Sequence, residues 1–312
     1  MITRASVMAI LPLAMILSIL PVAAAEMATE SPLERPSVVV TTEVLGAVVS
    51  ELVGDAAEVT VLMSAGADPH SWQPSARDSQ ALFEADVVVA NGLGLEEGLL
   101  AVLGQAEADG VPVFHATDHV DVRPDAGAAD HEATETDHDH TAGDPHFWLD
   151  PLAMREVVVA LAPALAEVGV DATDRAEELA GDLAALDAEL DTVLAGVPDE
   201  RRQLVTGHGA LGYFADRYAF RIVGTVIPGL SSSDEPSARD IAELVESVRE
   251  AGTTVVFSDV GTPPSVAEAV AAETGARLIV LQVAQLPESG SYADLLREIA
   301  VTIAAALGEQ SR

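Results

Sequence analysis

Ser37-Val38-Val39-Val40-Thr41-Thr42 (SVVVTT) is the stretch of this 312-residue chain that most clearly predicts its architecture. Its β-branched side chains favour a strand that is buried on both faces, as in a parallel sheet. Glu43–Val53 follows directly and carries apolar residues at helical spacing. A buried strand followed at once by such a helix predicts an α/β fold.

The same alternation of strands and helices recurs in two series along the chain. The first series has strands at Glu58–Met63, Asp86–Ala90 and Val111–Phe114 and a helix at Ser75–Glu84 with Ser75 as its N-cap. The second series has strands at Gln203–Thr206, Arg221–Val226, Thr253–Ser258 and Arg277–Val283, and helices at Ala210–Arg217, Ser237–Glu250, Pro264–Thr274 and Tyr292–Leu307. Between the series lie a helix over 152–169 and a longer one over Asp171–Val197.

We therefore expect two lobes, each with a mostly parallel sheet flanked by helices, joined by a long backbone helix. The expected boundaries are 37–170 for the N-terminal lobe, 171–197 for the linking helix and 198–312 for the C-terminal lobe.

The first 36 residues predict export. An apolar run from Ala5 to Val22 ends in Ala23-Ala24-Ala25, a small-residue pattern that suits signal cleavage. We expect a signal peptide over 1–25, a flexible tail over 26–36 and a mature chain in the periplasm or another extracytoplasmic space, with no stable membrane insertion. The run is also long enough to remain as a membrane anchor if it is not cleaved.

Composition excludes several classes of partner and site. The chain has 51 acidic and 15 basic residues, a formal net charge of −36, which disfavours nucleic acid and anionic lipid as partners. It has no cysteine, so disulfide scaffolds, thiolate metal sites and a cysteine-linked lipid anchor are not expected. A transition-metal site would have to use imidazole and carboxylate ligands.

Three histidines lie in turns that the predicted sheets place at one edge. His70 follows the strand Glu58–Met63, His146 precedes a helix in a Pro-containing turn, and His208 stands between two glycines after the strand Gln203–Thr206. Ligands of open α/β sheets bind beyond the carboxyl ends of strands. Three imidazoles plus a carboxylate or water make a four-coordinate zinc site. His70 or His146 taken singly is explained equally well as a turn residue bonded to the backbone. His208 is the stronger candidate, because the glycines on both sides leave space for its ring.

Three motifs around these histidines resemble those of a known family. Gly66–Ser75 (GADPHSWQPS), Asp144–Pro151 (DPHFWLDP) and Thr206–Phe214 (TGHGALGYF) are similar, in this order, to the ligand motifs of zinc/manganese substrate-binding proteins of ABC importers, the ZnuA-like group. The resemblance covers nearly all of the chain after the predicted signal peptide.

The resemblance implies a ligand set, a cargo and a partner. It implies that His70, His146 and His208 bind a metal ion in a cleft between the lobes and that the long helix spans both lobes. Family members with histidine at the third position favour zinc, and those with a carboxylate there favour manganese. We therefore expect Zn²⁺, with Mn²⁺ as the alternative, carried by a monomer to an ABC permease.

The resemblance leaves the fourth ligand open. The family often has an aspartate some residues before a Ser-Tyr pair such as Ser291-Tyr292, and Gln285 stands at that position here. Glu288 is the nearest acid, and Asp259, which follows the strand Thr253–Ser258, is another candidate. Water and Gln285 itself complete the alternatives.

Residues of about 116–145 form a long acidic, histidine-rich loop, and the family often has such a loop. His131, His138 and His140 lie in it among aspartates and glutamates. One hypothesis is auxiliary metal capture beside the cleft. The alternative is a solvated segment whose histidines bind nothing specific.

Aromatic and acidic residues near the three histidines are candidates for a supporting role. Trp72, Trp148 and Tyr213 belong either to the core or to an apolar surround that excludes water from the metal. Asp150 and Asp216 are candidates to orient an imidazole through its second nitrogen.

The sequence thus predicts a binding protein and not an enzyme. Two other classes remain: a metal-dependent adhesion protein of the same fold, and a zinc hydrolase with three histidine ligands and a bound water. The hydrolase would need a general base beside the metal, and the chain has no H-E-x-x-H pair.

Overall fold

The structure is a computed structural model that describes residues 35–124 and 143–308. These residues belong to one compact unit, Arg35–Arg312. The predicted signal peptide (1–25), most of the predicted tail (26–36) and the loop histidines His131, His138 and His140 lie outside the described residues.

The first lobe is built on a parallel sheet. Its four strands have the order β2-β1-β3-β4 and are β1 (Ser37–Val40), β2 (Glu58–Val61), β3 (Val87–Ala90) and β4 (Val113–His115). The connecting helices are α1 (Glu43–Val53), α2 (Ala76–Glu84) and α3 (Leu100–Ala108). Ser75 caps α2 as predicted, in a capping box with Asp78. α3 is not predicted from the sequence, because its apolar residues lack helical periodicity.

The second lobe contains two parallel strand pairs. β5 (Gln203–Thr206) pairs with β6 (Arg221–Thr225), and β7 (Val255–Ser258) pairs with β8 (Arg277–Val280). β5 and β7 lie close to each other. The helices of this lobe are α6 (Gly212–Arg217), α7 (Ala238–Ala251), α8 (Pro264–Thr274) and α9 (Tyr292–Gly308). Short 3₁₀ segments in the described residues are Gly54–Ala56, Glu97–Leu99, Ala116–His119, Phe147–Leu149, Asp199–Arg201 and Gly209–Leu211.

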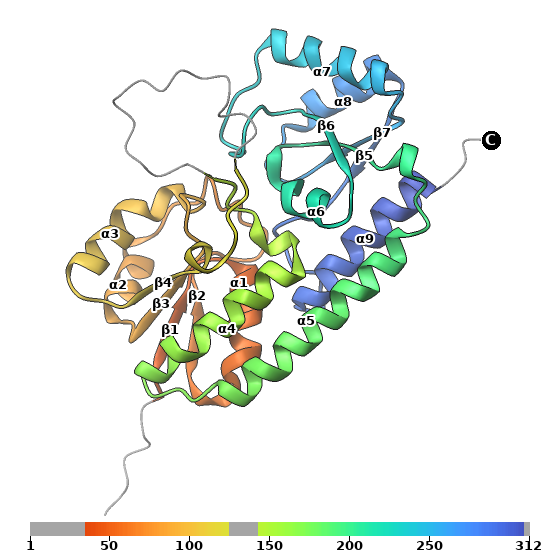
Figure 1. The fold of residues 1–312 in the computed structure, drawn as a ribbon. Coiled ribbons are helices and arrows are strands. Elements are labelled where there is room, and N and C mark those ends of the chain that lie inside the picture. Colours follow the sequence, from red (N-terminus) through yellow and green to blue (C-terminus); the bar gives the residue numbers. More distant parts are fainter. Residues whose placement is uncertain (1–34, 125–142, 309–312) are drawn as a thin grey trace, which may run out of the picture. The chain divides into compact units, whose positions relative to one another are not determined.

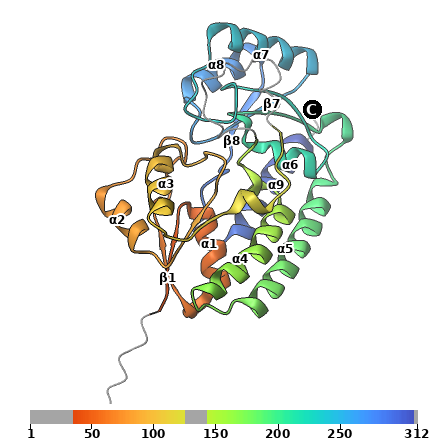
Figure 2. The ribbon, with the colours of Figure 1, turned by 60° about the vertical axis from the view of Figure 1, so that its left-hand side comes forward.

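Three long helices join the lobes: α4 (Pro151–Glu167), α5 (Thr173–Leu194) and α9. α5 packs against α1, α4 and α9 (Figures 1 and 2). Five buried leucines of α5 recur every three or four residues and so form one apolar stripe. They are Leu179, Leu183, Leu186, Leu190 and Leu194.

Both lobes share a single hydrophobic core along these helices. In β1, Val38 and Val40 belong to this core, whereas Val39 packs in a separate cluster with residues of α2 and α3. In β7, Phe257 belongs to the shared core and Val256 packs with residues of α7 and α8. Alternate residues of a strand face opposite sides of its sheet, so one face of each sheet is committed to the shared core. A core this extensive restricts rotation of one lobe against the other.

These observations confirm the predicted α/β fold with two lobes and a long connecting helix. Most strands are shorter than predicted, by one to three residues at one end. β1, β2, β6 and β8 end early because their β-branched or apolar runs continue into the loops at the carboxyl edge, as with Leu62 and Met63 beyond β2, which are buried without pairing in the sheet. β3, β4 and β7 instead begin later than predicted.

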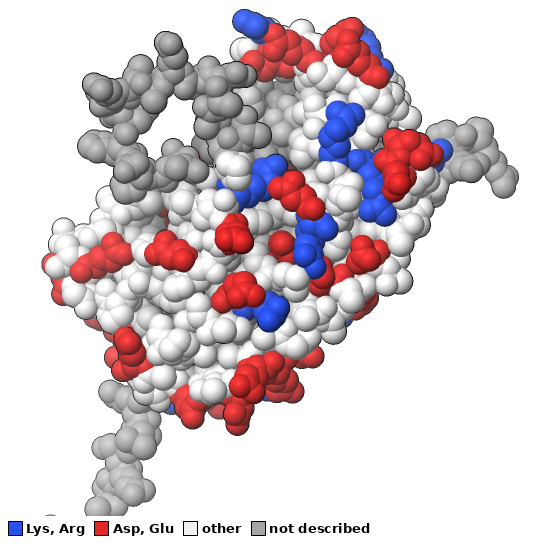
Figure 3. Space-filling model, in the orientation of Figure 1, with Lys and Arg blue, Asp and Glu red and all other residues white. Residues whose placement is uncertain are grey.

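Arginines supply every basic side chain of the protein, because the sequence contains no lysine. Figure 3 shows acidic side chains spread over one face, with the arginines standing among them. Typical pairs are Arg297 with Glu189 at 2.9 Å and Arg123 with Asp216 at 2.7 Å. Within residues 35–124 and 143–308, no helix has both the length and the apolar character needed to cross a bilayer.

The shared core predicts that the lobes unfold together. Replacing Leu190, which is fully buried on α5, by alanine should lower the free energy of unfolding by about 2–5 kcal/mol through loss of burial and a residual cavity. Urea unfolding followed by circular dichroism should remain a single transition. The exposed Asp182→Ala change on the same helix is the control. Separate transitions for the two lobes would contradict a common core.

Candidate metal centre

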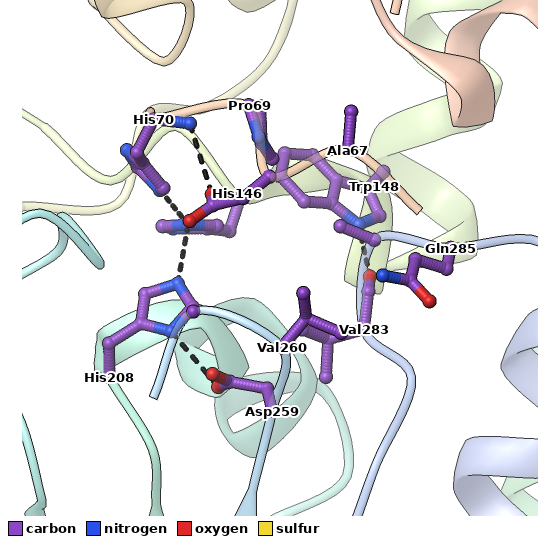
Figure 4. Close-up of a pocket in the computed structure, with 13 residues that line it drawn as sticks. Ala67, Pro69, His70, His146, Trp148, His208, Asp259, Val260, Val283 and Gln285 are labelled. Atoms are coloured by element: carbon purple, nitrogen blue, oxygen red, sulfur yellow. Dashed lines mark hydrogen bonds and ion pairs between the residues drawn. The ribbon is translucent and has the colours of Figure 1, made fainter. Parts of the chain in front are cut away.

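Three histidines from distant parts of the chain converge on one point. His70 lies in the turn after β2, His146 in the turn before α4 and His208 in the turn after β5. The Nε2 atom of His146 is 3.3 Å from the Nε2 atoms of both His70 and His208. All three side chains are buried, and Figure 4 shows the rings pointing toward one another from separate loops.

Two of the turns have the same sequence, Asp-Pro-His, and the same local hydrogen bond. The backbone N–H of His70 donates to Oδ1 of Asp68 at 3.1 Å, and that of His146 donates to Oδ1 of Asp144 at 2.9 Å. An aspartate that accepts from the backbone two residues later stabilises such a turn. The proline between them fixes one backbone angle and has no N–H to satisfy. The sequence therefore favours this turn through local interactions alone.

The third turn depends on glycine. A Cβ atom on Gly207 would collide with the side chains of Thr262 and Asp259 in the loop after β7. Only glycine lets the backbone before His208 approach that loop so closely. The approach brings Asp259 within hydrogen-bonding distance of the His208 ring.

Carboxylates determine which ring nitrogens are free. Nδ1 of His146 donates to Oδ1 of Asp144 at 2.8 Å, and Nδ1 of His208 donates to Oδ2 of Asp259 at 2.9 Å. A carboxylate can only accept, so each neutral imidazole carries its proton on Nδ1 and a lone pair on Nε2. The two Nε2 lone pairs then face each other at 3.3 Å. Facing lone pairs repel unless a cation lies between them.

The spacing of the nitrogens fits a metal ion. Zinc binds imidazole at about 2.0–2.1 Å, so two nitrogens of a tetrahedral site lie about 3.3–3.4 Å apart. The nitrogen pairs that involve His146 have this separation. Among the described residues, these three histidines form the one group of potential ligands whose donor atoms all lie within 4.8 Å of one another.

Burial keeps the site in the form that binds metal. Burial, together with the neighbouring rings of His146 and His208, lowers the pKa of His70 to about 2. Burial also lowers the pKa of His146, although Asp144 opposes the shift. Both rings are therefore neutral at physiological pH and do not have to lose a proton to a binding metal.

Asp259 is ionised behind His208. Burial acts to raise the pKa of Asp259, but the hydrogen bonds from His208 and Thr262 outweigh it and the pKa is lowered. A carboxylate behind a ligand imidazole orients the ring and makes it a stronger donor.

The structure separates the candidates for the fourth ligand. Asp259 lies behind His208, bonded to its Nδ1 atom, and is outside the three-histidine group. Glu288 is exposed in a turn and does not line the pocket. Gln285 lines the pocket, and its amide donates to the carbonyl of Gly66 at 3.2 Å.

Of the three aromatic residues predicted to surround the metal, Trp148 alone lines the pocket. Its ring centroid is 5.2 Å from that of His146, and its indole N–H donates to the carbonyl of Val283 in the second lobe at 2.8 Å. Trp72 packs against the cluster under α2 and α3, and the hydroxyl of Tyr213 accepts from the backbone of Arg123 at 3.0 Å. Trp72 and Tyr213 therefore do not line the pocket.

Two acids considered as orienting residues have other partners. Asp150 caps α4 by accepting from the backbone of Leu152, and Asp216 pairs with Arg123. The ring of His146 is oriented instead by Asp144, which belongs to the second motif but was not predicted to have this role. The ring of His70 has Glu97 beside it, with Oε1 3.4 Å from Nδ1. The Asp-Pro-His repeat was the available signal for Asp144. No local pattern marks Glu97.

The chain matches one family model over residues 38–306, that of the zinc-uptake complex component A, periplasmic (ZnuA). The chain belongs to this family. A manganese-binding lipoprotein MntA of Halalkalibacterium halodurans is 27% identical to this ZnuA-family chain, over 88% of the chain and 90% of the relative. The high-affinity zinc uptake system protein ZnuA of Paracoccus denitrificans is 28% identical, over 88% of the chain and 93% of the relative.

A solved structure has the same fold. The periplasmic zinc-binding protein TroA of Treponema pallidum superposes with a TM-score of 0.75 at 25% identity, covering 88% of this chain and all of that one (100%). The two proteins thus share their fold over most of this chain.

Acid should destabilise the metal-free protein through His70. Its pKa is lowered on folding, so below about pH 6.5 the unfolded chain binds a proton that the folded chain does not, and stability falls by about 1.4 kcal/mol per pH unit for one such group. Urea unfolding in a chelator should therefore show a shallower pH dependence for His70→Gln than for the wild type. Equal slopes would contradict a neutral, buried His70.

The carboxylate behind His208 should strengthen metal binding. Asp259→Asn keeps the size of the side chain but removes its charge, and we expect zinc affinity to fall about 10–100-fold. Competition with a chromophoric chelator measures the change. Asp294→Asn, which breaks an exposed pair with Arg297, should leave affinity unchanged. Equal effects of the two substitutions would show that Asp259 has no specific role.

Proposed function

We propose that this protein captures Zn²⁺ outside the cytoplasm, between its two lobes, and delivers it to an ABC importer. The observation that carries the proposal is the convergence of three imidazole Nε2 atoms, two of them kept as lone-pair donors by carboxylates on Nδ1. Membership of the ZnuA family supports the periplasmic and transport parts of the proposal. The permease, a monomeric state and export through a signal peptide over 1–25 are inferred with it.

The donor set favours zinc over manganese. Neutral imidazoles suit zinc, whereas manganese prefers oxygen ligands. Both acids that line the pocket have other partners: Asp259 accepts from His208, and Asp68 accepts from the His70 backbone and from Ser232. Relatives are named for either metal, so Mn²⁺ remains the second cargo to test.

The same engagement of the acids argues for binding and not hydrolysis. A zinc hydrolase needs a carboxylate or histidine that is free to take a proton from a bound water. Asp259 orients an imidazole, and the rest of the pocket wall includes Trp148, Val260 and Val283. An apolar wall excludes water and offers no base for catalysis, while the three imidazoles hold the ion.

We also propose that the histidine-rich segment feeds the site. His131, His138 and His140 lie outside the described residues, but the segment's two ends are held together beside the pocket. The backbone N–H of Asp144 donates to the carbonyl of Arg123 at 2.8 Å, two residues before His146. Metal collected by this segment would be released next to the buried ligands.

Zinc binding tests the proposal directly. Titration should give one tightly bound Zn²⁺ per chain. Mn²⁺ should bind more weakly than Zn²⁺, by a factor of about ten or more. When the free zinc concentration is a thousand times the dissociation constant, bound zinc should raise the free energy of unfolding by about 4 kcal/mol.

The ligand assignment is tested by a pair of substitutions. His208→Ala removes one of the three converging donors and should abolish tight binding. His138→Ala should leave the dissociation constant unchanged and alter only the number of weakly bound ions. Equal losses from the two variants, or a preference for Mn²⁺, would overturn the proposal.

A further inference from the structure

The second lobe contacts the His70 side of the pocket through two adjacent serines. Ser231 and Ser232 lie in the loop between β6 and α7. The hydroxyl of Ser231 donates to Oε1 of Glu97 at 2.6 Å, and the hydroxyl of Ser232 donates to Oδ2 of Asp68 at 2.6 Å. Both acceptors are carboxylates of the first lobe, so these are charge-assisted bonds across the boundary between the lobes.

The two acceptors are also the two carboxylates that hold His70. Oδ1 of Asp68 accepts from the backbone N–H of His70 at 3.1 Å. Oε1 of Glu97, the same atom that Ser231 contacts, lies 3.4 Å from Nδ1 of the His70 ring. Each serine is therefore separated from His70 by a single carboxylate, one acting on its backbone and the other on its ring.

Comparison of the two Asp-Pro-His turns shows why His70 needs this support. In the turn of His146, one aspartate holds both the backbone and the ring, since Oδ1 of Asp144 accepts from both. In the turn of His70, Asp68 holds only the backbone, and its second oxygen bonds Ser232. The ring is left to Glu97, a longer contact from a half-exposed side chain. His70 is thus the least firmly held of the three rings.

The loop that carries the serines is shaped for this contact. The backbone N–H of Ser233 donates to the hydroxyl oxygen of Ser231 at 3.1 Å, which leaves its proton free to point at Glu97. A Cβ atom on Gly261 would collide with Ser232 and lie 3.1 Å from Oδ2 of Asp68. The absence of a side chain at Gly261 lets Ser232 reach the first lobe.

We propose that Ser231 and Ser232 are positioning residues for metal retention, acting together as a two-point latch on the carboxylates that hold His70. The inference rests on the proposed function and adds a route for release. While the latch is closed, Glu97 and Asp68 keep the imidazole of His70 at the ion. When the serine loop lifts away, His70 is the ligand that is freed first. The ion is then held by His146 and His208, whose orienting aspartates are independent of the latch.

The latch predicts a change in dissociation rate and not in association rate. In Ser231→Ala/Ser232→Ala, zinc should leave about tenfold faster, from the loss of two bonds to charged acceptors, while its association rate stays that of the wild type. Stopped-flow mixing of zinc-loaded full-length protein with excess chelator measures the first rate, and mixing of metal-free protein with zinc and an indicator measures the second.

Two controls distinguish positioning from general damage. Ser233→Ala changes an exposed neighbour in the same loop and should leave both rates unchanged. Ser231→Thr/Ser232→Thr keeps both hydroxyls and should restore slow release. The metal-free double alanine variant lacks the same two bonds, so its melting temperature should fall modestly, and the threonine variant should restore it.

The outcomes separate this inference from the proposed function. A wild-type protein that binds zinc, with release unchanged in the double alanine variant, overturns the latch alone. Faster release that the threonine variant does not restore overturns it as well. Failure of the wild-type protein to bind zinc would overturn the proposed function and the latch together.

Discussion

Two imidazole lone pairs face each other in the interior of this protein, and the rest of the site follows from that constraint. The Nε2 atoms of His146 and His208 lie 3.3 Å apart because Asp144 and Asp259 hold the protons on the opposite nitrogens. Such an arrangement is unfavourable until a cation occupies the space between the lone pairs. It persists because the loops are attached to two lobes that share one core and cannot separate freely. The stability of the fold thus holds the ligands in place before metal arrives.

The negative charge of this site lies on carboxylates that hydrogen-bond to the ligand imidazoles. Neutral imidazoles contribute no charge to the metal, and burial lowers the pKa of His70 and His146 so that they stay neutral. The compensating negative charge comes from the carboxylates that accept from Nδ1, of which Asp259 has a lowered pKa. This layout keeps oxygen ligands away from the ion and so favours zinc over manganese.

The fold was largely predictable because its signals are local. Runs such as SVVVTT, caps such as Ser75 and the leucine spacing of α5 predict element type without knowledge of the partners. α3 escaped prediction since its residues LAVLGQAEA lack a clear apolar face. The three histidines were predictable because each lies in a Gly- or Pro-containing turn, after a strand for His70 and His208 and before a helix for His146. The position of Asp259 just after a strand predicted that it lies near the site. Sequence alone could not distinguish a metal ligand from a residue that hydrogen-bonds to a ligand.

Contacts between lobes could not be predicted. Glu97, Ser231 and Ser232 carry no motif, and their relation to His70 exists only after both lobes have folded. Asp150 and Asp216 were considered as orienting residues because they lie near a ligand in the sequence. In the structure Asp150 caps α4 and Asp216 pairs with Arg123, so neither orients an imidazole.

The coordination of bound zinc can be observed directly by crystallography of the zinc-loaded protein at the zinc absorption edge. We expect one strong anomalous peak at about 2.0–2.1 Å from the Nε2 atoms of His70, His146 and His208, with Asp259 still bonded to Nδ1 of His208. A peak elsewhere, or zinc bound directly by Asp259 with His208 turned away, would contradict this expectation.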